Sequence, residues 1–188
     1  MLRSIAPVSM VVLLLIFTIG SGSRVYSAEG AVFGGAKYHS DVSLGFDLSP
    51  DKKAFTATFD GLEVRIDGPA SIPPVQTRAY SFVLPMSNAG ADEEIPFFVQ
   101  GYVINQKGGA ARLVFVVNGQ VSVSNFPYEA DNSFLEQFKV KAGAAKECRI
   151  TVFLLAERDS ASGASVYLNV ASIDTDLLKH QDPAKKPK

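Results

Sequence analysis

The sequence predicts an all-β protein, an antiparallel β-sandwich of about ten strands with a jelly-roll or immunoglobulin-like arrangement. Beyond residue 40, apolar and polar residues alternate in short runs, which is the period of strands with one buried face. Clusters of Gly, Pro, Asn and Asp separate these runs, and none of the runs has a convincing helical period. The 13 phenylalanines suit a core enclosed between two sheets.

The first three strands are expected to form a meander. The alternating run 42–48 ends at Ser49-Pro50-Asp51, a turn in which proline presets φ and aspartate can bond the backbone. A second alternating run, 55–59, is followed by Asp60-Gly61 and then by a third run, 62–66. An Asp-Gly pair between alternating runs predicts a tight hairpin, so we expect these strands to pair consecutively.

Seven further strands are expected along the body. Pro85 should end the first of them, and Asn118-Gly119 should form a second tight hairpin. The expected ranges are 80–84, 97–104, 113–117, 121–123, 134–140, 148–157 and 166–173. The composition of 134–140 suits either a short helix or an edge strand, and the shared parity of its apolar residues favours the strand.

The two ends of the chain differ from the body. Arg3, the apolar run 10–19 and the small residues before Ala28 have the layout of a secretory signal peptide, so residues 1–27 are expected to be removed. The apolar run is shorter than the roughly 20 residues that span a bilayer, although an uncleaved anchor is the alternative. We therefore expect a secreted or periplasmic protein, with one domain over 28–178 and a disordered Lys/Pro-rich tail over 179–188. The tail either contacts an anionic polymer or is simply solvated.

Composition excludes some classes of partner. The net charge is −1, and the basic residues near both ends leave the body mildly acidic, which argues against nucleic acid and against an electrostatic membrane binder. The single cysteine, Cys148, allows no intrachain disulfide. It shares the apolar parity of its strand, so a buried thiol is favoured over an intermolecular bridge.

No pattern for catalysis stands out, and we do not expect an enzyme. His39 and His180 lie near the ends of the body, outside any recognisable motif. Ser49 and Lys52 match Ser-x-x-Lys in spacing, but that motif needs a helix and this segment is a turn. Paired carboxylates could run a glycosidase, but candidates such as Glu63 and Glu157 lie at outward strand positions.

No cofactor is expected, with calcium as the one ion that acidic loops could hold. The spacings match no known loop template, so solvated acidic loops are the simpler interpretation. The candidate ligands are Asp92, Glu93, Glu94, Asp131, Asp174 and Asp176.

Sugar binding would need exposed aromatic rings, and tryptophan is absent. Of the tyrosines, Tyr80 shares parity with core residues. Tyr102 and Tyr128 are the best candidates for ligand binding, Tyr128 because it follows Phe126-Pro127 in a loop.

One segment resembles a known family. Residues 44–64, with their strand, Ser-Pro-Asp turn and second strand, are similar to a segment of an uncharacterised family of secreted β-sandwich proteins. The resemblance implies the fold and carries no activity.

The leading hypothesis is an exported, non-catalytic β-sandwich that acts by binding or structural contact at the cell envelope or outside the cell. The alternatives are a carbohydrate-binding module or, less favoured, a glycoside hydrolase with a cryptic carboxylate pair. The expected partner is a protein or a glycan, with no nucleic acid and no membrane segment after signal cleavage. A sugar module should present at least two coplanar, exposed tyrosines on one face, whereas a structural protein should present an apolar patch or an open strand edge.

Overall fold

The computed structural model describes residues 30–38, 42–67, 74–159 and 161–176, and all regular elements in these ranges are strands. The all-β prediction is confirmed, with twelve strands. They are β1 (Val32–Phe33), β2 (Lys37–Tyr38), β3 (Ser43–Leu48), β4 (Phe55–Asp60), β5 (Glu63–Ile66), β6 (Val75–Ser87), β7 (Glu94–Asn105), β8 (Gly109–Val117), β9 (Gln120–Phe126), β10 (Ala130–Lys141), β11 (Glu147–Arg158) and β12 (Val166–Asp174). The predicted signal peptide and tail, together with His39 and His180, lie outside the described residues.

Within the described ranges, no helix has the length and apolar character needed to cross a membrane.

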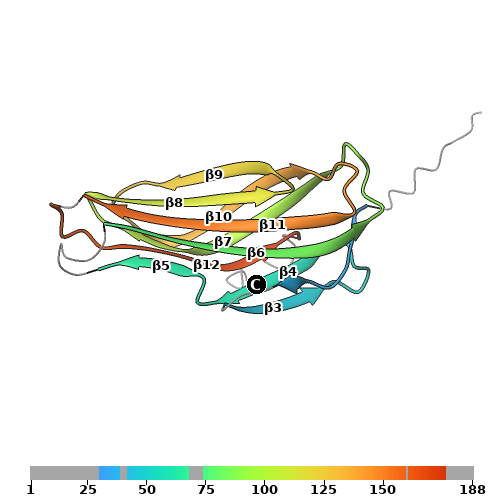
Figure 1. The fold of residues 1–188 in the computed structure, drawn as a ribbon, viewed down its shortest axis with the longest axis horizontal. Helices are drawn as coiled ribbons and strands as arrows, with labels where there is room; N and C mark the ends of the chain where they lie inside the picture. The colour runs from blue at the N-terminus through green and yellow to red at the C-terminus, as the bar shows by residue number, and fades with distance from the viewer. Residues whose placement is uncertain (1–29, 39–41, 68–73, 160, 177–188) are drawn as a thin grey trace, which may run out of the picture.

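The strands form two antiparallel sheets (Figure 1). Sheet I has the order β1-β6-β11-β8-β9, with β2 also paired to β6. Sheet II has the order β10-β7-β12-β4-β3, with β5 also paired to β12. Neighbours in each sheet are mostly far apart in the sequence, so a single core joins distant parts of the chain.

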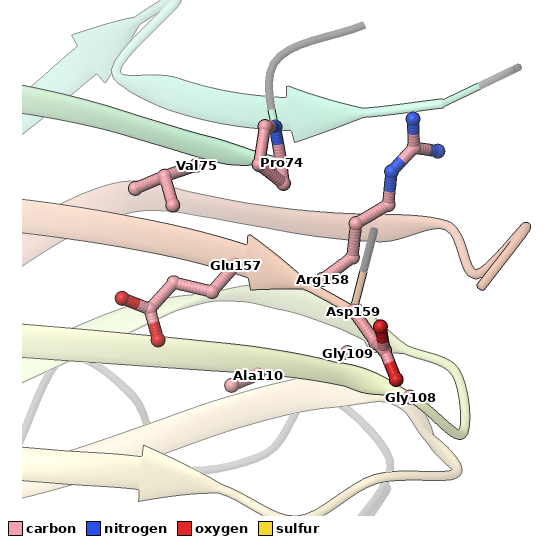
Figure 2. A pocket seen from close by; sticks show the side chains of 8 residues that line it. All are labelled: Pro74, Val75, Gly108, Gly109, Ala110, Glu157, Arg158 and Asp159. Atoms are coloured by element: carbon pink, nitrogen blue, oxygen red, sulfur yellow. The ribbon is translucent and has the colours of Figure 1, made fainter. Parts of the chain in front are cut away.

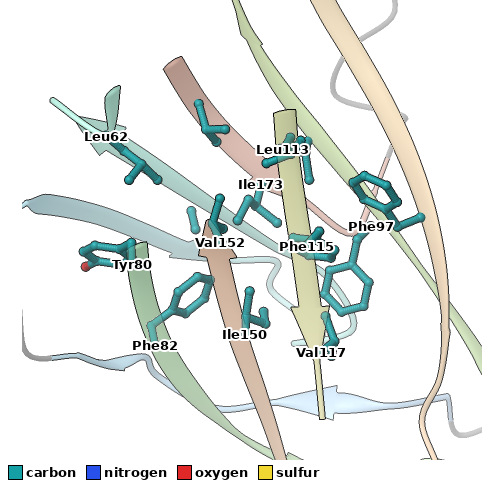
Figure 3. Packing of buried hydrophobic residues seen from close by; sticks show 14 of the residues in the cluster. Leu62, Tyr80, Phe82, Phe97, Leu113, Phe115, Val117, Ile150, Val152 and Ile173 are labelled. Carbon is teal, nitrogen blue, oxygen red and sulfur yellow. The ribbon is translucent and has the colours of Figure 1, made fainter. Parts of the chain in front are cut away.

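The core lies between the inner faces of the two sheets (Figure 3). The expected alternation holds: on β11, Ile150, Val152 and Leu154 are buried. Phenylalanine rings cross from one sheet to the other, because Phe97 of β7 lies 5.5 Å from Phe115 of β8, which stacks at 5.0 Å on Phe138 of β10. Such ring pairs stabilise a sandwich beyond the area that they bury.

The predicted meander is correct for its first pair and wrong for its second. β3 pairs with β4 as expected, but β5 does not fold back on β4. Both strands pair with β12, β4 along Ser172–Asp174 and β5 along Val166–Asn169. Gly61 has φ +82°, and this left-handed residue offsets the chain between two strands that continue along the same neighbour.

Three other predictions have clear outcomes. The Asn118-Gly119 hairpin is confirmed, with positive φ at both residues and Val117 paired to Gln120. The ambiguous segment 134–140 is part of an edge strand, β10. Pro85 does not end its strand, since β6 continues to Ser87. Its ring nitrogen lies on the side of β6 where β1 and β2 leave a gap, so no ladder hydrogen bond is lost.

A β-bulge on β12 shapes sheet II near its middle. The register against β7 shifts between Val170 and Ser172, which leaves Ala171 unpaired. Gly101 of β7 lies opposite Val170, and a Cβ there would overlap the Asn169 carbonyl oxygen and lie 2.6 Å from Phe134 Cζ. Glycine at position 101 is therefore required by the close approach of the two backbones.

Candidate functional site

The outer face of sheet II carries a group of polar and aromatic side chains, which we call the tyrosine face. It consists of two adjacent rows that run across β10, β7, β12 and β5. One row is Asp131, Ile104, Tyr167 and Arg65, and the other is Ser133, Tyr102, Asn169 and Glu63. These positions alternate with buried residues such as Val103 and Leu168, so their side chains point away from the core.

Two tyrosine rings lie at the centre of this face. Tyr102 and Tyr167 are diagonal neighbours on paired strands, which places their Cα atoms about 7–8 Å apart. The Tyr102 hydroxyl donates to the Asp131 carboxylate on β10, and the Tyr167 hydroxyl donates to Glu63 Oε2 at 2.9 Å on β5.

The two hydrogen bonds orient the rings. The Tyr102 hydroxyl reaches towards β10 and the Tyr167 hydroxyl towards β5, so the two rings lean across the sheet in opposite directions. Both side chains remain partly exposed. The tyrosine face therefore offers two ring surfaces to a ligand lying along it.

The same contacts affect how the phenols titrate. The hydrogen bond to Asp131 raises the pKa of Tyr102. The pKa of Tyr167 is raised first by burial and then by its hydrogen bond to Glu63. Both phenols are therefore protonated at neutral pH and act as donors to the carboxylates.

Asn169 has a structural role in the same rows. Its Oδ1 accepts the backbone N–H of Tyr102 at 2.7 Å. This bond lies next to the bulge, where the regular ladder between β7 and β12 is interrupted. The side chain thus replaces a ladder bond and fixes the backbone that carries the ring.

A hollow of about 210 Å³ opens at one end of the tyrosine face, lined by Glu63, Arg65, Asp67, Ile104, Ser165 and Tyr167. The Arg65 guanidinium pairs with Asp67 and lowers the pKa of that carboxyl. One wall of the hollow is therefore the Tyr167 ring, and around it lie the Arg65 guanidinium, which donates hydrogen bonds, and the Glu63 and Asp67 carboxylates, which accept them. Polar groups around an aromatic wall are suited to a neutral ligand rich in hydroxyls.

The outer face of sheet II continues past the bulge. The next outward residue on β7 is Gln100, which lies between Leu135 on β10 and Ser172 on β12. The Gln100 Nε2 atom is buried and makes no hydrogen bond with described residues. Ser172 Oγ donates to Asp174 Oδ2 at 2.9 Å.

A second hollow, of about 460 Å³, lies at the end of sheet I (Figure 2). Its charged residues do not converge, since Figure 2 shows Arg158 pointing away from Glu157 and Asp159. Much of its lining is backbone and small residues, Gly108, Gly109 and Ala110. This arrangement gives a ligand fewer directed contacts than the tyrosine face does.

The two predicted ligand-binding tyrosines fall in different places. Tyr102 is at the centre of the tyrosine face. Tyr128 is 63% exposed in the connection between β9 and β10, and among the described contacts none joins it to Tyr102. Its connection is fixed by the buried Asn105, whose Nδ2 donates to the carbonyls of Phe126 and Pro127 at 3.0 and 3.1 Å.

The calcium candidates are not brought together. Within the described part of the chain, no group of three His, Cys, Asp or Glu side chains could hold a metal ion. Glu93 accepts the backbone N–H groups of Ala31 and Gly90 at 2.9 and 3.0 Å. Asp131 and Asp174 accept tyrosine and serine hydroxyls on sheet II. Asp92 and Glu94 are exposed near Glu93, and Asp176 follows β12.

Sequence reasoning missed Tyr167 as a site residue and considered its partner Glu63 only as a candidate glycosidase carboxylate. The signal was present in the alternation of β12, where Val166, Leu168 and Val170 are buried and the intervening side chains must face outward. The pairing of β12 with β5 was hidden, because it joins residues more than 100 positions apart.

Comparison with protein families and with curated proteins gives no match. Structural comparison aligns this chain with parts of several solved structures, including the following three. A ruminal GH26 endo-β-1,4-mannanase aligns with 61% of this chain and 20% of its own, at 13% identity and a TM-score of 0.29. TmCBM61 in complex with β-1,4-galactotriose aligns with 72% and 88%, at 11% identity and a TM-score of 0.31. The mannan-recognising carbohydrate-binding module TmCBM27 aligns with 79% and 90%, at 9% identity and a TM-score of 0.27.

The chain spans about a fifth of the length of the mannanase. At these TM-scores the alignments carry no functional argument. The class that the molecule itself defines is an antiparallel β-sandwich with an aromatic, polar outer face on one sheet.

Proposed function

We propose that this protein is a non-catalytic, glycan-binding β-sandwich that holds a sugar chain across the tyrosine face. The observation that carries the proposal is the pair of rings at Tyr102 and Tyr167, leaned over the sheet by hydrogen bonds to Asp131 and Glu63. A pyranose ring has apolar C–H faces and a hydroxyl rim. Flat aromatic rings bordered by polar side chains match both parts.

The carboxylates of this face support binding rather than hydrolysis. A glycosidase needs one carboxyl group with a raised pKa to act as an acid and a second one across the bond that is cleaved. Here Glu63 and Asp131 accept tyrosine hydroxyls, and the pKa of Asp67 is lowered by Arg65. Each of these three carboxyl groups therefore has a partner on the face itself.

The proposal is tested by measuring binding to a panel of soluble polysaccharides and oligosaccharides with affinity electrophoresis and calorimetry. We expect Tyr102→Ala and Tyr167→Ala each to weaken binding about tenfold, since an aromatic contact contributes up to about 1.5 kcal/mol beyond its buried area. Tyr128→Ala is the matched control, because it removes an exposed tyrosine outside the face and should leave the affinity unchanged.

Other results would reject the proposal. Equal losses in all three variants would place the site elsewhere. Binding by none of the glycans would leave the tyrosine face without its proposed ligand class. Release of reducing ends from a bound polysaccharide, lost in Glu63→Gln, would instead support the hydrolase alternative.

Export is part of the proposal. It is supported by the signal-like layout of residues 1–27. Intact mass measurement of protein collected outside the cytoplasm should show the loss of about the first 27 residues. Full-length protein retained in the cytoplasm would contradict export.

A further inference from the structure

The outer face of sheet I differs in chemistry from the tyrosine face. Its centre consists of Val121 and Val123 on β9, Val114 and Val116 on β8, and Phe153 and Leu155 on β11, which we call the valine face. Val121, Val123 and Phe153 are 63%, 50% and 42% exposed. Exposed apolar patches of this extent mark interaction surfaces on soluble proteins.

The register shows that the valine face is continuous. One row across the sheet reads Ala79, Phe153, Val114 and Val123, and the next reads Ser81, Thr151, Val116 and Val121. Neither of these two rows contains a charged residue. The row on the other side of Phe153, through Leu155, contains Arg112, whose Nε donates to Asn125 Oδ1 at 2.7 Å. The two hydroxyl groups in the second row bond to each other, with Ser81 Oγ and Thr151 Oγ1 2.9 Å apart, so they can be covered at little cost.

Opposite charges lie at the two ends of this face, at equal distances from its centre. On β11, Arg149 precedes Phe153 by four residues and Glu157 follows it by four. Both lie on the outward parity of the strand, about 13 Å along it from Phe153. A two-fold axis in the interface, perpendicular to β11 and passing over Phe153, would place Arg149 of one copy over Glu157 of the other.

The area also suits a second copy. β6 and β11 each supply five outward positions, β8 supplies four and β9 three. At about 4.8 Å between strands and about 6.6 Å between outward residues they cover roughly 550 Å². Two such faces bury about 1,100 Å² in total, just above the roughly 1,000 Å² expected of a specific interface. Sheets packed face to face in this way are the same arrangement as the core of the sandwich itself.

We propose that the valine face is the interface of a symmetric homodimer, in which the β11 strands of two copies lie antiparallel across a two-fold axis at Phe153. Arg149 and Glu157 lie at mirrored positions about this axis and are complementary to each other across it, as an isologous interface requires, while Arg112 faces Val116 of the other copy. This inference does not depend on the proposed glycan site, which lies on the other sheet.

The test is sedimentation equilibrium of the purified protein, with whatever N-terminal processing the expressing cell carries out, at protein concentrations from micromolar to millimolar. We expect a dimer, and we expect Phe153→Lys to raise its dissociation constant about 30-fold or more, because it places two charges at the centre of the interface. Leu135→Lys is the matched control: Leu135 is 52% exposed on the outer face of sheet II, so the dimer should persist.

A charge exchange tests the register of the two copies. Arg149→Glu and Glu157→Arg should each raise the dissociation constant about fivefold, and the double variant should restore the original value. Arg149 also lies 3.6 Å from Glu147, so Glu147→Gln controls for loss of that ion pair and should have no effect.

Each part of the proposal can be overturned. A monomer at millimolar concentration, or a dimer that Phe153→Lys leaves intact, would show that this face is not a self-interface. Equal dissociation by Leu135→Lys would assign the contact to sheet II. Failure of the double charge variant to recover would reject the two-fold axis at Phe153. Thermal melting of each variant verifies that it is folded.

Discussion

At the scale of single residues, hydrogen bonds decide which side chains can serve a ligand. The hydroxyl groups of Tyr102 and Tyr167 each donate a hydrogen bond to a carboxylate, so the part of each side chain left to contact a ligand is the ring. Tyr80 illustrates the opposite outcome. It is buried and packs against Phe59 and Phe82 at 5.2 and 6.2 Å, as its parity in the sequence predicted.

Cys148 gives a residue-scale prediction. Burial raises the pKa of its thiol from 9.0 to about 12. The pKa of the Cys148 thiol is higher in the folded protein than in the unfolded one. The thiol therefore makes its full contribution to the free energy of unfolding below pH 9, and this contribution is lost as the pH rises from 9 towards 12. Native protein at pH 8 should therefore react with a thiol reagent only as fast as it unfolds, whereas denatured protein should react at once.

The measurement is the absorbance of the released aromatic thiol, followed with and without denaturant. A covalent dimer that disappears on reduction would contradict the buried thiol and support the intermolecular bridge. Val123→Cys provides a positive control, because it places a thiol at a half-exposed position of the valine face.

At the scale of strands, the bulge on β12 connects fold stability to the tyrosine face. Gly101→Ala would force a Cβ against the Asn169 carbonyl and Phe134. We expect a loss of about 1–3 kcal/mol in the free energy of unfolding, as for other overpacked positions. Glycan binding should weaken as well, since Asn169 holds the backbone of Tyr102.

Chemical denaturation measures the stability change, and calorimetry with an oligosaccharide measures the binding change. Gly35→Ala is the control, because a Cβ there meets no atom within 4 Å. An unchanged unfolding midpoint in Gly101→Ala would show that β7 and β12 can separate at the bulge without cost.

The strands also show what the sequence could predict. Alternation identified most strands and the inward positions, because burial of one face imposes a period of two wherever a strand lies. The Asn118-Gly119 hairpin was predictable because its turn is local. The in-line arrangement of β4 and β5 was not predictable, since it depends on both strands pairing with β12, which follows 100 or more residues later.

The tyrosine face was predictable only in part, for the same reason. Tyr102 was identified from its own strand, but Asp131, Glu63 and Tyr167 come to it through pairings between strands that are distant in sequence. Tyr128 was chosen for its place in a loop, and loop position alone does not say which face a side chain shares.

At the scale of the whole molecule, the two proposals give the two sheets different roles: sheet I forms the dimer interface and sheet II binds the glycan. The valine face is on the outside of sheet I and the tyrosine face is on the outside of sheet II, with the core between them. Pairing of two valine faces would leave both tyrosine faces uncovered and directed away from each other. A dimer of this kind presents two binding faces to a polymer.

This geometry predicts that dimerisation increases the affinity for long glycans and leaves the affinity for short ones unchanged. Once one face has bound a polymer, the second binds at the high effective concentration set by the dimer, a gain of about 10²-fold or more. Phe153→Lys should therefore lose most of its affinity for an immobilised polysaccharide while keeping its calorimetric affinity for an oligosaccharide. Tyr102→Ala should lose both. If Phe153→Lys weakened oligosaccharide binding as much as polymer binding, the valine face and the tyrosine face would not act independently. If it weakened neither, the second tyrosine face of the dimer would contribute nothing to retention on the polymer.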